Sequence, residues 1–224
     1  MKITLICNCG LVFSSGGELL LIDALTQELA PFYRAPEPVR QEIVTGTGAY
    51  TTVCGLLFTH LHPDHFDREA AQAFAAYHPN AVLYIPNRRE LLPECLSVGC
   101  FTVELHRVRH TQVAGYGKST VDTMIVSAEG KHVYVSSDAA PEVSLHESVL
   151  RGQSVDAAFW NGEMLLYKPE REALCRFASQ NFIYHIPGDP QDGLRRKLKR
   201  LCGRYPAELE TVRLLGDYPS EIIL

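Results

Sequence analysis

The sequence predicts an α/β protein (α+β in some schemes) built as a four-layer αββα sandwich, with two β-sheets face to face and helices outside. Three observations predict this architecture. Strand-like apolar runs come in two batches, helical segments follow each batch, and no linker or low-complexity segment divides the chain. Because 224 residues are enough for one domain with a substantial core, we expect residues 1–224 to form a single domain.

The first half of the chain is rich in short apolar runs typical of strands. Ser15-Gly16-Gly17 separates two of these runs and is typical of a hairpin turn. The segment from about Pro31 to Gly48 is polar and Pro-rich, so we expect a loop there. We expect strands at Ile3–Cys7, Leu11–Ser14, Glu18–Ile22, Cys54–Phe58, Ala81–Ile85 and Phe101–Arg109, and helices at Arg68–Tyr77, capped by Asp67, and Asn87–Leu92.

The second half of the chain repeats this pattern of strands followed by helices. The turn at Glu129-Gly130 joins a hairpin that ends at Asp138. The last helix, Leu194–Leu201, is basic and amphipathic, so we expect its charges to lie in water. The expected strands are Thr123–Ser127, Val133–Ser136, Ala157–Trp160, Phe182–Tyr184 and Val212–Leu215, and the other expected helices are Glu142–Leu150 and Glu170–Ser179.

Composition excludes several classes of protein. Hydrophobic residues make up 46% of the chain, but no apolar run is long enough to cross a bilayer, and Asn8 interrupts the first one too early for a signal peptide. Seven cysteines without disulfide-framework spacing indicate reduced thiols, and we expect Cys7 and Cys9 to be buried strand residues. We therefore expect a cytoplasmic protein without membrane contact, and the net charge of −5 disfavours nucleic acid as a partner.

The run Thr59–His65 is the most informative segment of the chain. It directly follows an apolar strand and precedes a helix. Side chains two apart in extended chain point the same way, so His60 and His62 can hold one ion together. Pro63 then turns the chain, and Asp64 and His65 can serve a second ion. Imidazole and carboxylate are zinc ligands, so the segment predicts a metal site rather than a solvated His-rich loop.

Thr59-His60-Leu61-His62-Pro63-Asp64-His65 resembles the signature of the metallo-β-lactamase superfamily. Other parts of that family's pattern follow in order, so the resemblance covers the chain from about residue 3 to 215. The run His65-Phe66-Asp67 is more similar to the lactonase and phosphodiesterase branches, whereas Ser-Ser-Asp-Ala replaces the commoner Gly-Asp-Thr. The further matching segments are Leu21-Ile22-Asp23-Ala24, Val108-Arg109-His110-Thr111, Val135-Ser136-Ser137-Asp138 and Ile183-Tyr184-His185.

The resemblance implies the αββα metallo-β-lactamase fold and a set of seven ligands for two metal ions. Asp138 would bridge both ions, Asp64 and Asp138 would take part in catalysis, and Asp23 would orient the loop. Two Zn²⁺ are expected, with Mn²⁺ or Fe²⁺ as alternatives. The first ion would take His60, His62 and His110, and the second would take Asp64, His65 and His185.

Three of these assignments have plain alternatives. His110 competes with His106, four residues earlier, and the His-Thr pair favours His110. Asp138 could instead cap a helix, and His185 could instead be a core histidine. We expect the remaining histidines, His78, His132 and His146, to be solvated.

The predicted site indicates hydrolysis. Two Zn²⁺, a hydroxide and the carboxylates of Asp64 and Asp138 sum to +1, so we expect a small anionic substrate, such as a phosphodiester, a lactone or another ester. Lys118 and Tyr116, in the loop after His110, are candidates to contact it, unless that loop is merely solvated. The alternatives are an iron-dependent redox member and a non-catalytic metal-binding or sensing protein of the same fold. A homodimer is compatible with the sequence.

Overall fold

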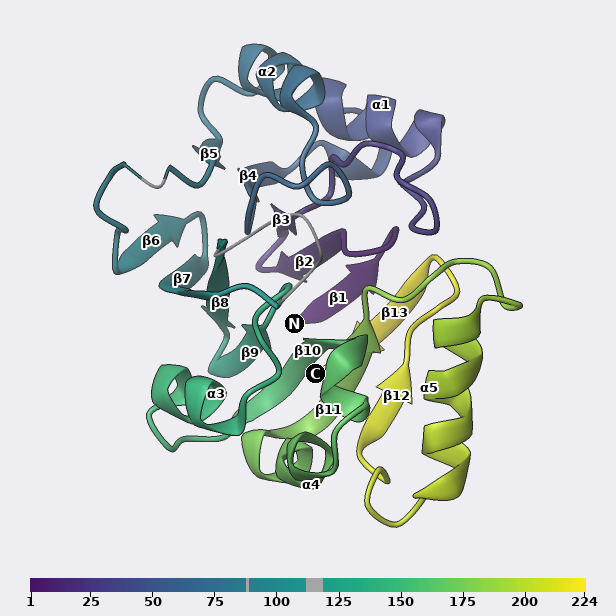
Figure 1. Ribbon diagram of the computed structural model, residues 1–224. Helices are drawn as coiled ribbons and strands as arrows, with labels where there is room; N and C mark the ends of the chain where they lie inside the picture. The colour runs from purple at the N-terminus through teal and green to yellow at the C-terminus, as the bar shows by residue number, and fades with distance from the viewer. Residues whose placement is uncertain (88, 112–118) are drawn as a thin grey trace.

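The computed structural model describes residues 1–87, 89–111 and 119–224, and these form two β-sheets that pack face to face (Figure 1). The first sheet has the strand order β13-β1-β2-β3-β4-β5 and the second has the order β12-β11-β10-β9-β8-β7-β6. The strands are β1 (Lys2–Leu5), β2 (Leu11–Ser15), β3 (Glu18–Ile22), β4 (Val53–Leu57), β5 (Val82–Tyr84), β6 (Cys95–Val98), β7 (Phe101–Arg109), β8 (Thr120–Ala128), β9 (Lys131–Val135), β10 (Val155–Asn161), β11 (Ala178–Tyr184), β12 (Val212–Leu214) and β13 (Ser220–Ile223).

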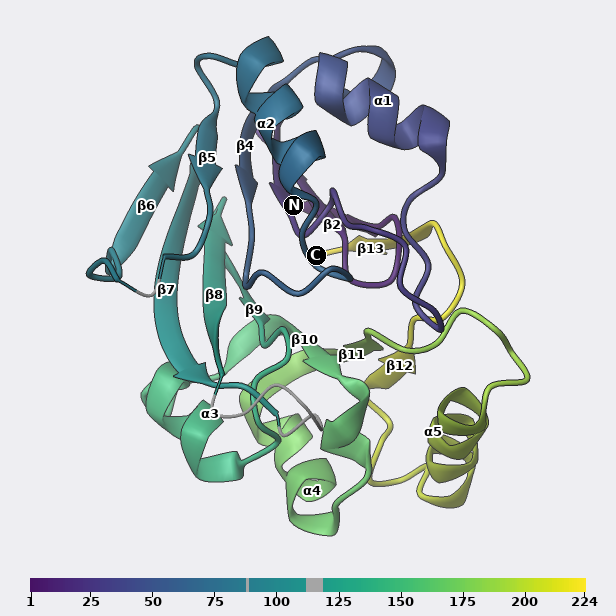
Figure 2. The same ribbon diagram turned by 45° about the horizontal axis from the view of Figure 1, so that its top comes forward.

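Helices cover the two outer faces, so the molecule has four layers. Figure 2 shows α1 and α2 over the first sheet and α3, α4 and α5 on the opposite side, against the second sheet. The predicted αββα architecture is therefore confirmed. The helices are α1 (Glu37–Thr45), α2 (Arg68–Tyr77), α3 (Val143–Leu150), α4 (Lys168–Phe177) and α5 (Gly193–Arg204), with short 3-10 turns η1 (Gly48–Tyr50) and η2 (Gly162–Leu165).

The main core lies between the sheets. It takes alternate residues from strands of both sheets, including Phe13 from the first and Phe159 and Phe182 from the second, all fully buried. The ring centroids of Phe159 and Phe182 lie 5.2 Å apart. Burying a side chain of this kind is worth about 1.5–3 kcal/mol, so this layer supplies most of the force that holds the sheets together. Two further apolar clusters join each sheet to its helices.

Strand direction determines where the site can form. β3, β4 and β5 are parallel to one another, and so are β9, β10, β11 and β12. Because parallel strands end at the same edge of a sheet, the residues after β3, β4, β9 and β11 gather along one rim. β7 is antiparallel to β8, which in turn is antiparallel to β9, so the end of β7 lies at this rim as well.

Local signals explain how α2 begins. The Asp67 side chain accepts hydrogen bonds from the backbone N–H groups of Glu69 and Ala70, as expected of a helix cap. The same carboxylate pairs with Arg40 of α1 at 2.7 Å, and Arg40 also donates to the carbonyl of Thr26. One residue therefore starts α2 and ties it to α1.

The prediction of a loop from Pro31 to Gly48 was wrong, because α1 occupies Glu37–Thr45. Pro36 stands at the N-cap and Pro38 lies in the first turn, where the missing N–H costs nothing. Gly46 ends the helix in the left-handed conformation. The prolines that suggested a loop therefore mark the start of a helix.

The predicted helix at Asn87–Leu92 was also wrong, since the described residues there form a turn, a bend and irregular chain. The Asn87 side chain accepts a hydrogen bond from the backbone of Arg89 and donates to Glu90, which stabilises a local turn instead of a helix. Two short strands, β6 and β13, were not predicted. β6 pairs with β7 alone and β13 with β1 alone, so both are edge strands.

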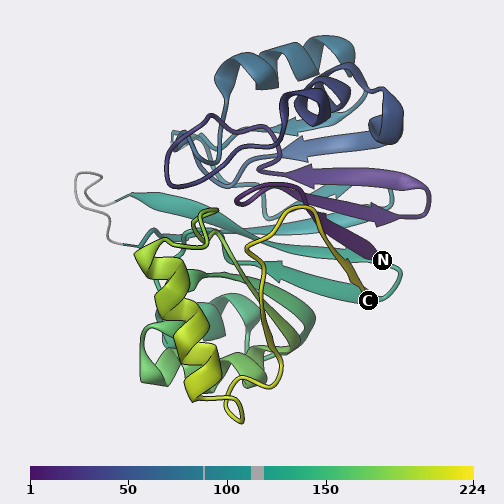
Figure 3. The ribbon, with the colours of Figure 1, turned by 90° about the vertical axis from the view of Figure 1, so that its right-hand side faces the viewer.

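The two ends of the described chain meet at one edge of the first sheet. β1 pairs with β13 in antiparallel register, and the N–H of Leu224 donates to the carbonyl of Met1 (Figure 3). Among the described residues, no helix combines the length and the apolar character required to span a bilayer.

Candidate metal centre

The histidine cluster sits on the loop between β4 and α2. Asp23, the residue after β3, anchors the start of this loop, because its carboxylate accepts hydrogen bonds from the N–H and hydroxyl of Thr59 at 2.8 and 2.6 Å. The turn is closed where the backbone N–H of His65 bonds the carbonyl of His62 at 3.0 Å. Asp23 is fully buried, so it orients the loop from beneath, as the sequence resemblance implied.

Three other strand ends deliver the remaining residues. His110 follows β7, Asp138 lies three residues after β9, and His185 follows β11. The N–H of Thr111 donates to the carbonyl of Asp138 at 2.8 Å, which joins the first two of these strand ends. The N–H of His185 donates to the carbonyl of Asn8 at 3.1 Å, which joins the third to the first sheet. Both sheets therefore contribute to the cluster.

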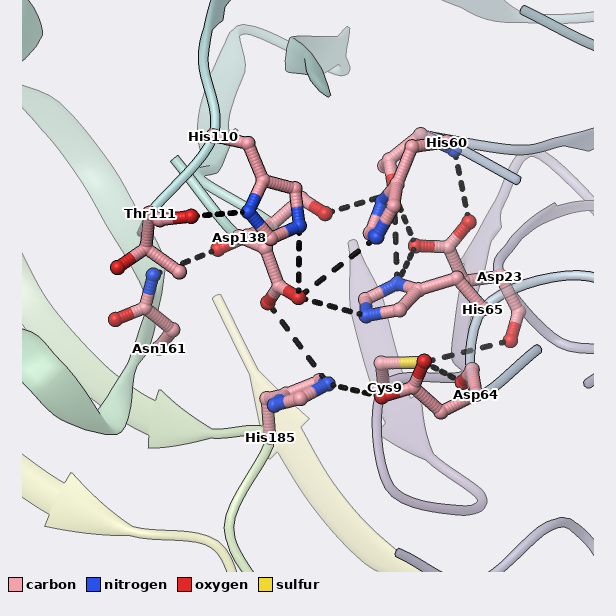
Figure 4. Close-up of polar contacts among 12 residues, drawn as sticks. Cys9, Asp23, His60, Asp64, His65, His110, Thr111, Asp138, Asn161 and His185 are labelled. Carbon is pink, nitrogen blue, oxygen red and sulfur yellow. Dashed lines mark hydrogen bonds and ion pairs between the residues drawn. The ribbon is translucent and has the colours of Figure 1, made fainter. Parts of the chain in front are cut away.

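The structure brings all seven residues of the predicted ligand set together. Figure 4 shows those other than His62. Their donor atoms form two groups whose members lie within 4.8 Å of one another. This division matches the one that the sequence resemblance implied. The first group is His60, His62, His110 and Asp138, and the second is Asp64, His65 and His185.

The carboxylate of Asp138 stands between the two groups. Its Oδ2 atom lies 3.7 Å from His60 Nε2, 3.4 Å from His65 Nε2 and 3.5 Å from His110 Nε2, while Oδ1 lies 3.8 Å from His185 Nε2. The Nε2 atom of His185 also lies 3.2 Å from Asp64 Oδ2. Two ligands that each lie about 2.1 Å from a tetrahedral ion are about 3.4 Å apart, so these spacings suit metal ligands.

The hydrogen bonding of the imidazoles supports the same interpretation. His65 Nδ1 lies 2.9 Å from Asp23 Oδ2, and His110 Nδ1 lies 2.7 Å from the carbonyl oxygen of Thr111. Both partners are acceptors, so each Nδ1 carries the proton and each Nε2 presents a lone pair. Within the described part of the chain, the buried Nε2 atoms of His60, His65 and His110 make no hydrogen bond. Unsatisfied buried acceptors that converge on one carboxylate fit a bound cation.

The electrostatics fit a cation as well. Burial lowers the pKa of His60 well below its usual value, so its ring is neutral. Burial alone would raise the pKa of Asp138, but the charges of the neighbouring imidazoles, above all His185 and His65, hold it well below its usual value. Burial opposes protonation of His65, yet the carboxylates of Asp138 and Asp23 help to raise its pKa well above the usual value. The potential that attracts a proton to His65 would equally attract a metal ion.

Backbone strain is concentrated at this site. Asp23, Ser137 and His185 have φ values of 49°, 48° and 52°, in the left-handed region that non-glycine residues rarely adopt. Each such residue costs about 1–2 kcal/mol. All three follow strands that end at the site, and the Ser137 hydroxyl lies 2.7 Å from that of Thr59. Positions that are strained and held in place in this way are typical of functional sites.

The structure adds residues that sequence reasoning missed. Cys9 is buried as expected, but it lies in the loop after β1 rather than in a strand, and its thiol donates to the carbonyl of Asp64 at 3.1 Å. Burial raises the pKa of the Cys9 thiol well above its usual value, so it is a neutral donor. Thr111, Asn161 and Glu163 also reach the site. Thr111 belongs to the His-Thr pair of the sequence motif, whereas Asn161 and Glu163 belong to no motif, and only their proximity in the fold identifies them.

The remaining histidines lie away from the cluster. His106 is partly buried in β7, with Nε2 3.8 Å from a carboxylate oxygen of Glu104. His132 is exposed, as expected. The expectation of a solvated His146 was wrong, because it is fully buried and lies 2.9 Å from the Tyr134 hydroxyl. His78 is partly buried, and its Nε2 lies 3.1 Å from the carbonyl oxygen of Ile43, so it too is engaged by the fold.

A cavity of about 210 Å³ opens beside the cluster, which gives a small molecule access to it. Lys118 and Tyr116, the predicted substrate contacts, lie outside the described residues. The cavity is lined by Leu29, Phe32, His62, Asp64, His110, Thr111, Asp138, Asn161, Gly162, Glu163, His185 and Leu194.

Solved structures share this architecture over the whole chain. Isothiocyanate hydrolase from gut bacteria of Delia radicum matches with a TM-score of 0.68 at 16% identity, over 100% of this chain and 99% of that one. The metallo-β-lactamase fold protein YhfI from Bacillus subtilis matches with a TM-score of 0.66 at 13% identity, over 99% of each chain. CmlA, a diiron β-hydroxylase from Streptomyces venezuelae, matches with a TM-score of 0.63 at 12% identity, over 100% of this chain and 54% of that one.

No protein-family model and no curated protein matches the sequence. The structural likeness establishes the fold: the chain has the metallo-β-lactamase fold, as its sequence resemblance predicted. The seven residues of the predicted ligand set lie together at the rim where the strand ends meet.

Proposed function

We propose that this protein is a metal-dependent hydrolase with two ions, zinc in the first instance, held at the histidine cluster. The observation that carries the proposal is the convergence of three buried, unsatisfied Nε2 atoms on the Asp138 carboxylate beside an open cavity. His60, His62 and His110 would hold one ion, and Asp64, His65 and His185 the other, with Asp138 between them.

Bound ions of this kind lower the pKa of water to about 7 and polarise a carbonyl or phosphoryl oxygen. The chain's own residues supply the rest. Asp23 and the carbonyl of Thr111 fix the tautomers of His65 and His110, so that both rings present Nε2 to the centre. Asp64 and Asp138 line the cavity, where an ionised carboxylate can orient an attacking water or accept its proton. No serine or cysteine nucleophile is required.

The substrates that suit this chemistry are small esters, lactones and phosphodiesters. The shared fold with isothiocyanate hydrolase supports hydrolysis as the reaction class and adds isothiocyanates to the compounds worth testing. Action in the cytoplasm and assembly as a homodimer stay predictions from the sequence.

The test combines metal content with activity. Elemental analysis of protein purified without chelator should find about two transition-metal ions per chain, mostly zinc. The protein should then hydrolyse at least one member of a panel of bis-p-nitrophenyl phosphate, phenyl esters, lactones and isothiocyanates, with little activity on β-lactams. Asp138→Asn keeps the shape but removes the charge, so it should lose at least one ion and cut turnover by orders of magnitude.

The outcomes separate the alternatives. Iron as the only metal, together with redox activity and no hydrolysis, would replace the hydrolase by an iron-dependent redox enzyme. Two bound zinc ions without turnover of any compound would indicate a binding or sensing protein. A reproducible metal content near zero would remove the basis of the proposal.

A further inference from the structure

The cavity beside the metal centre has one wall of apolar side chains. Leu29, Phe32 and Leu194 come from two distant segments of the chain and line the same space. The ring of Phe32 packs on that of His185, with centroids 4.4 Å apart, so the apolar wall begins directly at the proposed ligands. Leu29 is 38% exposed, which places it at the mouth. An apolar group of a bound molecule would lose its contact with water here.

The other wall carries the carboxylate of Glu163. This residue belongs to η2, and two hydrogen bonds fix its position. Its backbone N–H donates to Asn161 Oδ1 at 3.0 Å, and its carboxylate accepts a hydrogen bond from the Thr111 hydroxyl. The amide of Asn161 is itself held by the carbonyl oxygens of Ser137 and Ala139, at 3.1 and 3.0 Å. Glu163 is therefore a fixed negative charge at the cavity wall.

The described part of the cavity lining gives an anion no side chain of opposite charge. Among the described residues that line it there is no lysine and no arginine. A second cavity of about 480 Å³ shares Thr111 and Glu163 with the first, and it adds two further glutamates, Glu142 and Glu170. Its arginine, Arg109, is already paired with Glu142. A substrate that extends beyond the first cavity would therefore meet more negative charge.

The charge of the whole site follows from these residues. Two divalent ions, a hydroxide and the carboxylates of Asp64 and Asp138 sum to +1, which is the basis for expecting an anionic substrate. Asp23 hydrogen-bonds His65 directly beneath the centre, and Glu163 faces the cavity. These two carboxylates bring the sum to −1. Within the described residues, the carboxylates thus remove the electrostatic reason for an anionic substrate.

We propose that the substrate is a small uncharged molecule with a compact apolar group, and that Glu163 selects against anions. The apolar group would lie against Leu29, Phe32 and Leu194, with the bond to be cleaved facing the metal centre. This inference rests on the proposed hydrolase function, and it narrows the substrate class to neutral esters and comparable neutral electrophiles.

The experiment compares two ring compounds of matched size, p-cresol and 4-hydroxybenzoate, by isothermal titration calorimetry on the purified protein. In Glu163→Gln, the affinity for 4-hydroxybenzoate should rise about ten-fold relative to that for p-cresol, because one unit charge at short range in a partly buried site has an effect of this size. The affinity for p-cresol itself should stay within about two-fold, which also shows that the variant is folded. Glu172 is an exposed carboxylate on α4 that pairs with Lys168. Glu172→Gln is therefore the matched control and should change neither the affinity for p-cresol nor that for 4-hydroxybenzoate.

A second variant tests the apolar wall. Leu29→Ala should weaken the binding of p-cresol about three- to ten-fold through the apolar area lost. The matching esters, p-tolyl acetate and 4-acetoxybenzoate, extend the test to turnover, where Glu163→Gln should raise kcat/KM for the anionic ester about ten-fold relative to the neutral one.

The two proposals fail in different ways. If no ester is hydrolysed but Glu163→Gln still changes the relative affinities, the hydrolase proposal is wrong and the pocket assignment stands. If esters are hydrolysed and Glu163→Gln changes the affinities for both ring compounds equally, Glu163 does not select by charge. A wild-type preference for 4-acetoxybenzoate that Glu163→Gln leaves unchanged would also overturn the inference.

Discussion

At the scale of single residues, Asp138 and its neighbours illustrate how position gives an ordinary side chain a special role. The carboxylate is buried among imidazoles, and their positive potential keeps it ionised despite the cost of burial. In the described part of the chain, the Nε2 atoms of His60, His65 and His110 find no other partner. Such an arrangement is costly without a cation, and this is the physical basis for proposing one.

The pair His106 and His110 tests this assignment at residue resolution. His110 faces Asp138, with its Nε2 3.5 Å from Oδ2, whereas His106 lies four residues earlier and is next to Glu104. We predict that His110→Ala loses metal and lowers activity by at least about a hundred-fold, as the loss of a catalytic metal ligand does. His106→Ala should keep both, measured by elemental analysis and kcat/KM. The reverse result would mean that the third histidine is wrongly assigned.

The expected exposure of His146 was one residue-scale prediction that was wrong. His146 is a lone histidine in an amphipathic helix, so a solvated position was expected, but it packs among Tyr134 and Trp160. Burial lowers its pKa to about 4, which keeps the ring neutral and able to bond the Tyr134 hydroxyl. A single histidine carries no periodic signal that separates burial from exposure, so only the packing decides.

At the scale of elements, Asp67 connects the metal-binding loop to two helices. It caps α2, pairs with the nearly buried Arg40 of α1, and follows His65 by two residues. The predicted cap at Asp67 was correct, whereas α1 was not predicted, so the sequence showed only half of this connection. Tight helix packing around Asp67 fixes the end of the loop that presents Asp64 and His65.

We predict that Asp67→Ala destabilises the protein by about 2–4 kcal/mol. Loss of the cap costs about 1 kcal/mol, and the loss of the closest carboxylate of the buried Arg40 guanidinium costs more. Urea unfolding of the purified protein measures this as a lower midpoint with an unchanged slope. Glu69→Ala, in the same helical turn but without such contacts, serves as the control and should stay within about 0.5 kcal/mol of wild type. Equal stability of the two variants would contradict the role of Asp67.

At the scale of the whole molecule, the site joins the two sheets. The loop after β4 belongs to the first sheet, while the ends of β7, β9 and β11 belong to the second. Ions held between these segments would therefore act as a link across the sandwich, in addition to the apolar core between the sheets. Stability and metal content should be coupled for this reason.

We predict that removing the metal with a chelator lowers Tm by about 5–10 °C. At a metal concentration about 100 times its Kd, binding adds about 2.7 kcal/mol to the free energy of unfolding. The Tm of a chain of this size shifts by about 2–4 °C for each kcal/mol. Scanning calorimetry before and after chelation measures the shift, and added Zn²⁺ should restore it. His106→Ala should lose stability on chelation as wild type does. An unchanged Tm, in protein shown to have lost its metal, would separate metal binding from folding.

The sequence by itself determined the layered fold and the residues that meet at its rim. Strand periodicity, the Asp67 cap and the spacing of His60, His62, Asp64 and His65 are local features, and local features fix local conformation. The order of the later motifs then indicated which strand ends would converge. The edge strands β6 and β13 escaped prediction, whereas β5 and β12, which also lie at sheet edges, were predicted.

Only the tertiary structure decided what surrounds the site. Leu29, Phe32, Leu194 and Glu163 lie far apart along the chain and carry no shared motif, yet they line one cavity. Their meeting depends on how the helices and loops pack over the sheets, and no periodicity in the sequence encodes that packing. The charge of the site likewise depended on the tertiary structure. The ligands were visible in the sequence, whereas the carboxylate that makes the cavity unfavourable for anions was brought there by the fold.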